Sequence, residues 1–297
     1  MSPSIPACRW LALFTLFAAG LVACATAPEP VGPERKETLI AVTHDHQLIR
    51  FNAGQPQRIL DRKPLVGLPA GDNLIGIDFR VARGVLYGLS RQGLLFTIDP
   101  ASGRLTRVGD KPLALALPGA SVGFDFNPAA DRIRVVSGSF NLRLHPDTGY
   151  AVDGDPTTAG VQPDGRLAYA AGDVNAGHAP DIVSAGYTYN PRDEKLTTNF
   201  ALDRALGTLV MQGSHEDTQP PVSPNTGRLT TIGPLGLGPF ADASFDIADL
   251  SNAAFAAVRL NTSGPTRLYS VDLADGRATP LGTVGVPSAL LGLAVEP

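Results

Sequence analysis

The chain has 297 residues, with 24 basic and 28 acidic side chains and a formal net charge of −4. This balance provides no basic field of the kind that nucleic-acid-binding domains use, so nucleic acid is not an expected partner. The 32 glycines and 26 prolines predict frequent turns and few long helices, and the only cysteines are Cys8 and Cys24.

The first 23 residues have the features of an export signal. Arg9 precedes an apolar stretch, WLALFTLFAAG (10–20), that is shorter than the roughly 20 residues of a membrane-spanning helix. The next four residues, LVAC (21–24), resemble the lipobox at which bacteria acylate a cysteine and cleave just before it. We therefore interpret residues 1–23 as a lipoprotein signal peptide and Cys24 as the lipidated (palmitate-type) first residue of the mature protein. The alternative is an ordinary signal peptide cleaved at a small residue.

The residues after Cys24 predict where and how the protein is held. Ala25 is not the aspartate that retains some lipoproteins at the inner membrane, so we expect a bacterial envelope protein anchored by lipid in the outer membrane and facing the periplasm. Residues 24–37 are rich in proline, alanine and charge and predict a flexible tether. Residues 38–297 then form one domain without a disulfide, which must be held together by packing alone.

A short phrase recurs five times in this domain, with a small residue first and large apolar residues second and fourth. The copies are GIDF (76–79), GFDF (123–126), GYTY (186–189), SFDI (244–247) and GLAV (292–295). Further strand-like runs follow the phrases, which gives about four strands in each unit. The two shortest spacings between copies are 47 and 48 residues. Such a unit is typical of a β-propeller blade.

The repeat is split between the two ends of the domain. The last phrase has no room for a blade after it, whereas LIAVT (39–43) and QLIRF (47–51) begin the domain with no phrase before them. We predict an all-β fold, a β-propeller of five four-stranded blades closed by pairing of the N- and C-terminal strands. Six blades would result if the long interval from Gly123 to Gly186 contained a degenerate one. A β-sandwich is the alternative, but it gives no reason for the split.

Several segments also resemble a known family. They are GFDFNPAADRIRVVS (123–137), NLRLHPDTG (141–149), AYAAGDVNAG (168–177) and NTGRLTTIGPLG (225–236), and they resemble domain of unknown function 4394. The resemblance extends from about Thr38 to the end of the chain. It implies a secreted or lipid-anchored bacterial protein built of propeller repeats, and it implies no reaction, ligand or catalytic residue.

Alternation along the phrase predicts that its third residues surround a central channel, if the phrase is the innermost strand. Three of these residues are carboxylates, Asp78, Asp125 and Asp246, which makes them candidate channel or cation ligands. A Ca²⁺ ion would relieve their repulsion, because hard cations take carboxylate oxygens. Whether a metal or another cofactor is bound stays open at this point.

The structural alternative for the channel aspartates is that each one is satisfied by hydrogen bonds. Aspartate often accepts from nearby backbone N–H groups, and here such bonds would join one blade to the next. Basic side chains in the same segments could add to this, namely Arg80, Arg132 and Arg134. We favour this interpretation.

The long interval after Gly123 also contains a candidate loop binding site, because loops on one face of a repeat fold often carry binding. Its polar residues include Asp153, Asp155, Asp173 and Asn175. The spacing of Asp173 and Asn175 resembles the start of a calcium loop, but the glycine and closing glutamate of that pattern are missing.

Two functions are consistent with these features. The first is a non-enzymatic binding or scaffolding propeller that engages a protein, glycan or small ligand. The second is a calcium-dependent hydrolase similar to lactonases, in which the channel aspartates hold a metal that polarises a carbonyl. That reaction needs a general base beside the metal, and no recurring phrase contains a histidine. We therefore favour binding.

The lipobox generates the first testable prediction. We expect mass spectrometry of the mature protein to find an acylated Cys24 at the N-terminus, and a Cys24→Ala variant to be released from the membrane. A Cys24→Ala variant that stays membrane-bound, or an unmodified N-terminus at another residue, would contradict the lipoprotein interpretation.

Overall fold

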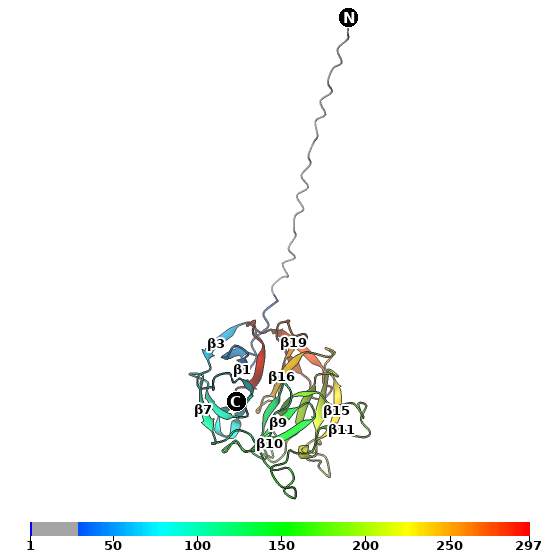
Figure 1. Cartoon of the computed structure of the whole chain (residues 1–297). Helices are drawn as coiled ribbons and strands as arrows, with labels where there is room; N and C mark the ends of the chain where they lie inside the picture. Colours follow the sequence, from blue (N-terminus) through cyan, green and yellow to red (C-terminus); the bar gives the residue numbers. More distant parts are fainter. Residues whose placement is uncertain (2–28) are drawn as a thin grey trace.

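The computed structural model describes Met1 and residues 29–297, so residues 2–23 of the predicted signal peptide and Cys24 lie outside the described residues. No helix in this described part is long and apolar enough to cross a membrane. It contains two short 3₁₀ turns, η1 (Val81–Arg83) and η2 (Pro224–Thr226), and strands that make up five sheets arranged around an axis (Figure 1).

The five sheets are the blades of a propeller. The first blade orders its strands as β20 (Leu290–Val295), β1 (Thr38–Thr43), β2 (Gln47–Asn52) and β3 (Ile59–Pro64). The second contains β4 (Leu74–Arg80), β5 (Val85–Ser90), β6 (Leu95–Asp99) and β7 (Arg104–Val108). The third contains β8 (Gly123–Asn127), β9 (Arg132–Ser137) and β10 (Phe140–Leu144). The fourth contains β12 (Ile182–Tyr187), β13 (Asn199–Asp203), β14 (Thr208–Gln212) and β15 (Arg228–Pro234). The fifth contains β16 (Asp242–Ile247), β17 (Ala254–Arg259), β18 (Arg267–Val271) and β19 (Ala278–Thr283).

The recurring phrase forms the innermost strand of every blade, which confirms the predicted five-bladed propeller. Strands β20, β4, β8, β12 and β16 contact one another in this order around the axis. The small first residue of the phrase permits the close approach. A Cβ at Gly76 would lie 2.4 Å from the Cβ of Phe124, and one at Gly186 would lie 2.8 Å from the ring of Phe245.

The ring closes as the split repeat predicts. Strand β20 pairs antiparallel with β1, with Leu39 opposite Val295 and Val42 opposite Gly292 (Figure 1). A salt bridge of 2.7 Å between Arg50 and Glu296 supports the same seam. Because both ends of the chain contribute to one sheet, the N-terminal strands β1, β2 and β3 gain the innermost strand that completes their blade, and the inner edge of β1 is covered.

The third blade departs from the four-strand pattern and explains the long interval of the repeat. The segment after β10 makes only one bridge, from Ala151 to Leu144, in place of a full outer strand. The chain then crosses to the fourth blade, where β11 (Ala168–Tyr169) pairs parallel with β15 as a fifth strand. The sixth blade that we considered is therefore absent from residues 29–297, and the extra residues form an insertion between blades.

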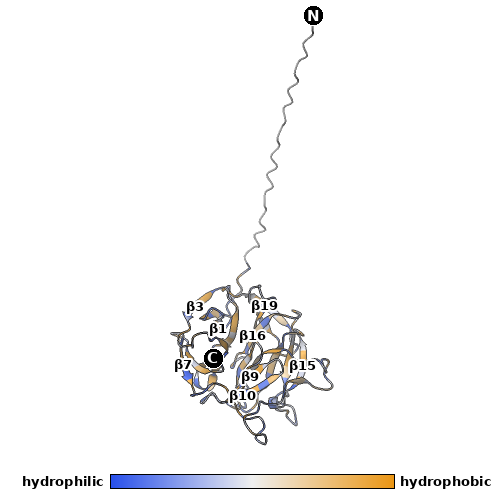
Figure 2. Ribbon diagram, viewed as in Figure 1, coloured by the Kyte–Doolittle hydropathy of each residue, from blue (hydrophilic) through white to orange (hydrophobic). Residues whose placement is uncertain are grey.

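The apolar core lies between neighbouring blades rather than within them. One cluster combines Leu39 and Phe51 of the first blade with Phe255 of the fifth, and another combines Ile40 with Leu86 of the second blade. Apolar residues accordingly recur along the strands of the ring (Figure 2). Each fully buried side chain of this size contributes about 1.5–3 kcal/mol, so the blades stabilise one another.

Part of the predicted tether is packed against the propeller. Asn52 and Arg35 exchange two hydrogen bonds of 2.8 and 2.9 Å between the side-chain amide and the backbone. The Arg35 guanidinium also lies 5.6 Å from the centre of the Phe255 ring, and Gln55 donates to the carbonyl of Gly32. Glu29 accepts from the backbone N–H of Thr283 at 2.9 Å. Residues 29–37 are thus a docked strap, which corrects the predicted tether over this part.

Ring closure generates the second prediction. Deleting residues 290–297 should lower the unfolding midpoint by more than 10 °C or prevent folding, because it removes four buried side chains (Leu290, Leu293, Ala294 and Val295) and exposes the edge of β1. Thermal unfolding followed by circular dichroism measures this. As a control, shortening the protein by Glu296 and Pro297 alone should have a much smaller effect, and equal midpoints for the long deletion and the intact protein would contradict closure.

Candidate functional site

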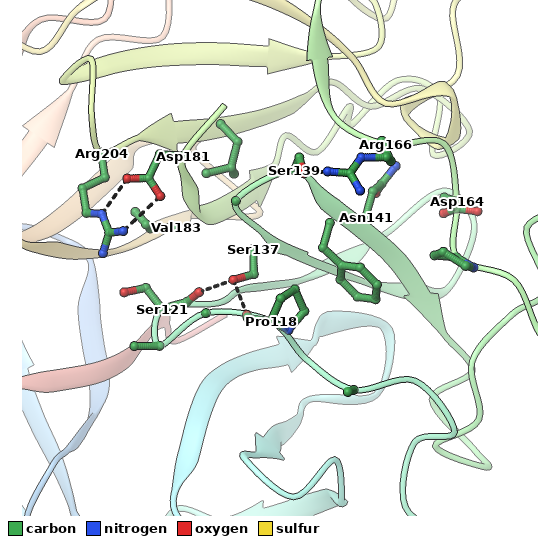
Figure 3. A pocket seen from close by; sticks show the side chains of 17 residues that line it. Pro118, Ser121, Ser137, Ser139, Asn141, Asp164, Arg166, Asp181, Val183 and Arg204 are labelled. Carbon is green, nitrogen blue, oxygen red and sulfur yellow. Dashed lines mark hydrogen bonds and ion pairs between the residues drawn. The ribbon is translucent and has the colours of Figure 1, made fainter. Parts of the chain in front are cut away.

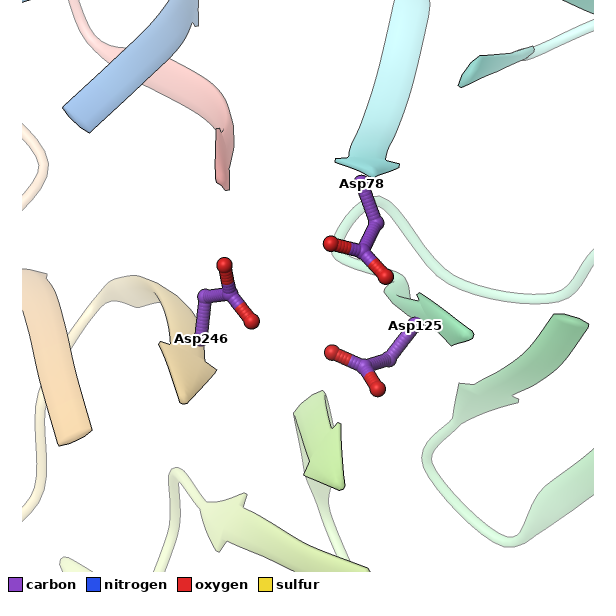
Figure 4. Close-up of side chains that lie close together, drawn as sticks. All are labelled: Asp78, Asp125 and Asp246. Carbon is purple, nitrogen blue, oxygen red and sulfur yellow. The ribbon is translucent and has the colours of Figure 1, made fainter. Parts of the chain in front are cut away.

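Three buried carboxylates converge on the propeller axis. Asp78, Asp125 and Asp246 come from β4, β8 and β16, and each offers an oxygen that lies within 4.8 Å of the other two (Figure 4). They are 7%, 4% and 5% exposed. Thr188 and Ala294 occupy the equivalent places in the other two blades and supply no carboxylate. In the described residues this is the only group of three or more candidate metal-binding side chains.

Each of these carboxylates also joins one blade to another. Asp78 accepts from its neighbour Phe79 and from the backbone N–H of Phe126 in the next blade, both at 2.7 Å. Asp125 accepts from the backbone N–H of Tyr187 at 3.0 Å. Asp246 accepts from Val295, which lies in the strand that closes the ring, at 2.6 Å. The backbone bonds that we favoured from the sequence are therefore present.

The arginines that we expected to assist do not bind these carboxylates. Arg80 instead pairs with Asp131 and with Asp147, the latter at 2.5 Å. Arg134 pairs with Asp164 at 2.7 Å, and the Arg132 side chain donates to a backbone carbonyl. That part of the prediction is wrong, because Arg80 and Arg134 extend toward loop carboxylates and Arg132 toward the backbone, rather than toward the axis.

Without a basic partner, the axial carboxyls favour their neutral forms. Burial raises the pKa of Asp78 and Asp125 well above the usual value, and repulsion between the carboxylates raises both further. Burial also raises the pKa of Asp246 to about 6, although backbone hydrogen bonds and the contact with Asp125 oppose this rise. Asp249 lies nearby, and burial followed by the charge of Asp246 raises its pKa to about 7. The cluster therefore shares protons near neutral pH.

The oxygens left for a cation are few. Asp78 and Asp246 use both oxygens as acceptors of backbone hydrogen bonds, whereas Asp125 uses one. A Ca²⁺ ion takes six to eight oxygen ligands. The carboxylate cluster fits proton sharing better than it fits calcium, and bound Ca²⁺ stays a prediction that can be tested.

The four candidate loop residues are separated into two local motifs. Asp153 and Asp155 cap turns of their own loop: Asp153 accepts from the backbone N–H of Gln162, and Asp155 accepts from the hydroxyl of Thr157. Asp173 accepts from the backbone N–H of Thr231 at 2.7 Å, and Asn175 donates to the Thr231 hydroxyl. These contacts fasten the insertion to β15 and to itself.

A pocket lies where the insertion meets the third and fourth blades. Its volume is about 550 Å³, and we call it the inter-blade pocket; its lining comprises Ala116, residues 118–121 and 137–141, Pro163, Asp164, Arg166, residues 181–183 and Arg204. Arg204 and Asp181 form an ion pair of 2.8 Å on one side, and Arg166 donates to Ser139 on another (Figure 3). Phe140 adds a half-buried aromatic ring to the lining.

A buried ion network supports one wall of this pocket, and sequence reasoning missed it. The side chains of Arg134 and Asp164 are 2% and 1% exposed, and Arg143 binds the other oxygen of Asp164 at 2.7 Å. Asn141 accepts from Arg134 at 2.8 Å and from Gln212 at 3.0 Å. A charged residue in the middle of the apolar run IRVV (133–136) was the available signal, because such a charge needs a buried partner.

The axial cluster generates the third prediction. The folded pKa values of Asp246 and Asp249 lie above those of the unfolded chain, so the stability that these two groups contribute is complete below about pH 4 and is lost as the pH rises through about 6 to 7. Asp125→Asn keeps an acceptor for Tyr187 and removes a carboxyl whose pKa is raised by burial and by the neighbouring carboxylates. We therefore expect it to raise the unfolding midpoint at pH 8, and to raise it less at pH 5.

Thermal unfolding of both proteins at pH 5 and pH 8 measures this difference, with the exposed Asp193→Asn as a control that should follow the wild type. The same experiment should include chelator and added Ca²⁺. A wild-type midpoint that falls with chelator, while that of Asp125→Asn does not, would show a metal at the axis and contradict proton sharing.

Comparison with solved structures finds distant similarities. The structure of a nidogen–laminin complex has a TM-score of 0.46 at 14% identity, covering 88% of this chain and 98% of that chain. The glutaminyl cyclase of Myxococcus xanthus has a TM-score of 0.45 at 15% identity, covering 77% and 84%. A putative 6-phosphogluconolactonase from Bacteroides uniformis has a TM-score of 0.39 at 13% identity, covering 84% and 83%.

Sequence comparison identifies the family itself. No curated protein matches the chain. The profile of a domain of unknown function, DUF4394, matches residues 47–294, which is most of the propeller. The match agrees with the resemblance seen in the sequence segments, and the chain belongs to the DUF4394 family.

Proposed function

We propose that this protein is a lipid-anchored envelope protein whose propeller binds a compact polar ligand, such as a short glycan, in the inter-blade pocket. The observation that carries the proposal is the construction of that pocket. The one segment that breaks the repeat, the insertion after β10, forms a wall of it, and the buried pair of Arg134 and Asp164 holds this wall in place.

The cost of that network supports a binding role. Removing two charges from water costs several kcal/mol for each ion, which a pair repays only with good geometry and additional hydrogen bonds. Asp164 meets this condition, since both of its oxygens accept from arginines. The network holds rigid a loop that the propeller fold itself does not require. A pocket that is rigid before binding loses less entropy when the ligand binds.

The chemistry of the lining indicates a ligand with hydroxyl groups. Arg166 has guanidinium N–H groups beyond the one that it donates to Ser139, and the hydroxyl of Ser139 and the charged pair of Asp181 and Arg204 lie on the same lining. Phe140 offers an apolar surface for the face of a sugar ring. A few placed polar groups with an aromatic side chain are typical of sites for small polar ligands.

The second candidate function is a calcium-dependent hydrolase similar to lactonases. It is favoured by the convergence of Asp78, Asp125 and Asp246 on the axis, where a metal could polarise a carbonyl. The hydrogen bonds from backbone N–H groups to these carboxylates favour the structural role instead. We therefore prefer binding.

The fourth prediction tests the pocket. A panel of neutral and acidic mono- and disaccharides is screened by thermal shift with the purified protein, and hits are titrated by calorimetry. Ala120→Trp fills the pocket from an exposed position and should weaken binding at least tenfold. Val174→Trp, which changes a residue that is 83% exposed outside the pocket, should bind as the wild type does.

Two results would contradict the proposal. One is a saccharide panel that produces no shift, or a shift that survives in Ala120→Trp. The other is calcium-dependent hydrolysis of lactones that Asp125→Asn abolishes, which would make the hydrolase the better description.

A further inference from the structure

A second cavity lies at one end of the propeller axis and is distinct from the inter-blade pocket. Its volume is about 290 Å³, and we call it the axial cup; its lining includes Phe79, Phe126, Tyr189, Glu194, Asp249 and Leu250. These residues belong to the ends of the innermost strands of four blades or to the turns that follow them. Since the innermost strands surround the axis, their ends converge there. No residue lines both cavities.

The aromatic walls of the cup are fixed in place. Phe79 and Phe126 are 5% and 6% exposed, and the Phe126 ring packs edge-on against Tyr87 with 5.2 Å between ring centres. The backbone of Tyr189 exchanges two hydrogen bonds with the Asn252 side chain, at 2.8 and 2.9 Å. The cup therefore needs little rearrangement to accept a ligand.

The cup is electronegative. Its one basic residue, Arg80, is already paired with Asp131 and Asp147. In the part of the chain that the structure describes, no ion pair joins Asp249 or Glu194 to a basic group. Asp249 is close enough to the axial cluster for its charge to raise the pKa of Asp78 and Asp125. Aromatic rings and carboxylates without a counter-charge thus share one cavity.

We propose that the axial cup binds a small organic cation, such as a quaternary ammonium compound. The faces of aromatic rings attract cations that carry apolar substituents, and this attraction grows when the cation is removed from water. A metal ion instead requires several oxygen ligands close together, and among the described residues Asp131, Glu194 and Asp249 do not form such a group. The combination of aromatic residues with Asp249 in one lining favours a ligand that is both positively charged and partly apolar.

The proposed occupant also relieves an electrostatic cost of the fold. In addition to burial, the charges of Asp246 and Asp249 raise the pKa of both Asp78 and Asp125, so these carboxyls near the axis repel one another. An ammonium group in the cup would lie beside Asp249 and reduce that repulsion. This site goes beyond the proposed function, because saccharide binding in the inter-blade pocket does not depend on it.

The fifth prediction uses a pair of probes that differ in charge alone. Choline and its neutral carbon isostere, 3,3-dimethyl-1-butanol, are titrated calorimetrically into the purified protein in non-ionic detergent at pH 8.5, where Asp249 is ionised. Choline should bind at least tenfold more tightly than the isostere. Asp249→Asn should reduce choline affinity at least fivefold and leave the isostere unaffected, whereas the exposed Asp217→Asn, outside the cup, should change neither.

An aromatic variant provides an independent check. Tyr189→Leu keeps the backbone bonds to Asn252 and an apolar wall but removes the ring, so choline should bind several-fold more weakly while the unfolding midpoint changes little. Equal affinity for choline and its isostere, or no binding of choline, tetramethylammonium and 1,5-diaminopentane, would overturn the proposal. Calcium binding that Asp125→Asn abolishes, without any binding of ammonium compounds, would do so too.

Discussion

The structure depends on how closely the five innermost strands approach one another. Between blades the distance is so short that Gly76 has no room for a side chain beside Phe124. At the third position of the same phrase, Asp78 reaches the backbone of the next blade. The same four-residue phrase thus supplies the glycine that lets two blades come close and the aspartate that hydrogen-bonds one blade to the next. The repeat therefore determines the contacts between blades as well as the blades themselves.

The hydrogen bonds that Asp78, Asp125 and Asp246 accept from neighbouring blades fix how the blades join, at some cost in stability. Three carboxyls that are almost completely buried accept hydrogen bonds from the backbone of neighbouring blades, yet their burial, and then the repulsion between them, raises the pKa of Asp78 and Asp125 well above the usual value. These three carboxyls lie on innermost strands, and the outer strands of the blades do not contribute to the cluster. The apolar clusters between the blades stabilise the fold instead. Functional variation is therefore expected where the chain leaves the axis, and the insertion between the third and fourth blades is such a place.

The sequence predicted features that repeat and missed features that occur once. Blade number, ring closure and the axial position of Asp78, Asp125 and Asp246 follow from the phrase, because a shared pattern imposes a shared geometry. The partners of Arg134 could not be deduced, since Asp164 and Asn225 reach it from loops whose paths no pattern determines. The docking of residues 29–37 was missed for a related reason: composition rich in proline and charge describes a chain without regular structure, and says nothing of individual contacts with a neighbouring surface.

If the chain is anchored at Cys24, as we propose, the docked strap limits how far the propeller can move from the membrane. With Cys24 acylated, as proposed, five peptide steps separate the lipid from Glu29, and they span roughly 17 Å at most. The rim between the first and fifth blades would then rest beside the headgroups, with little freedom to turn away. The protein would sample only the thin layer of periplasm next to the membrane, so a molecule confined to that layer would reach its cavities far more often than one dispersed through the compartment.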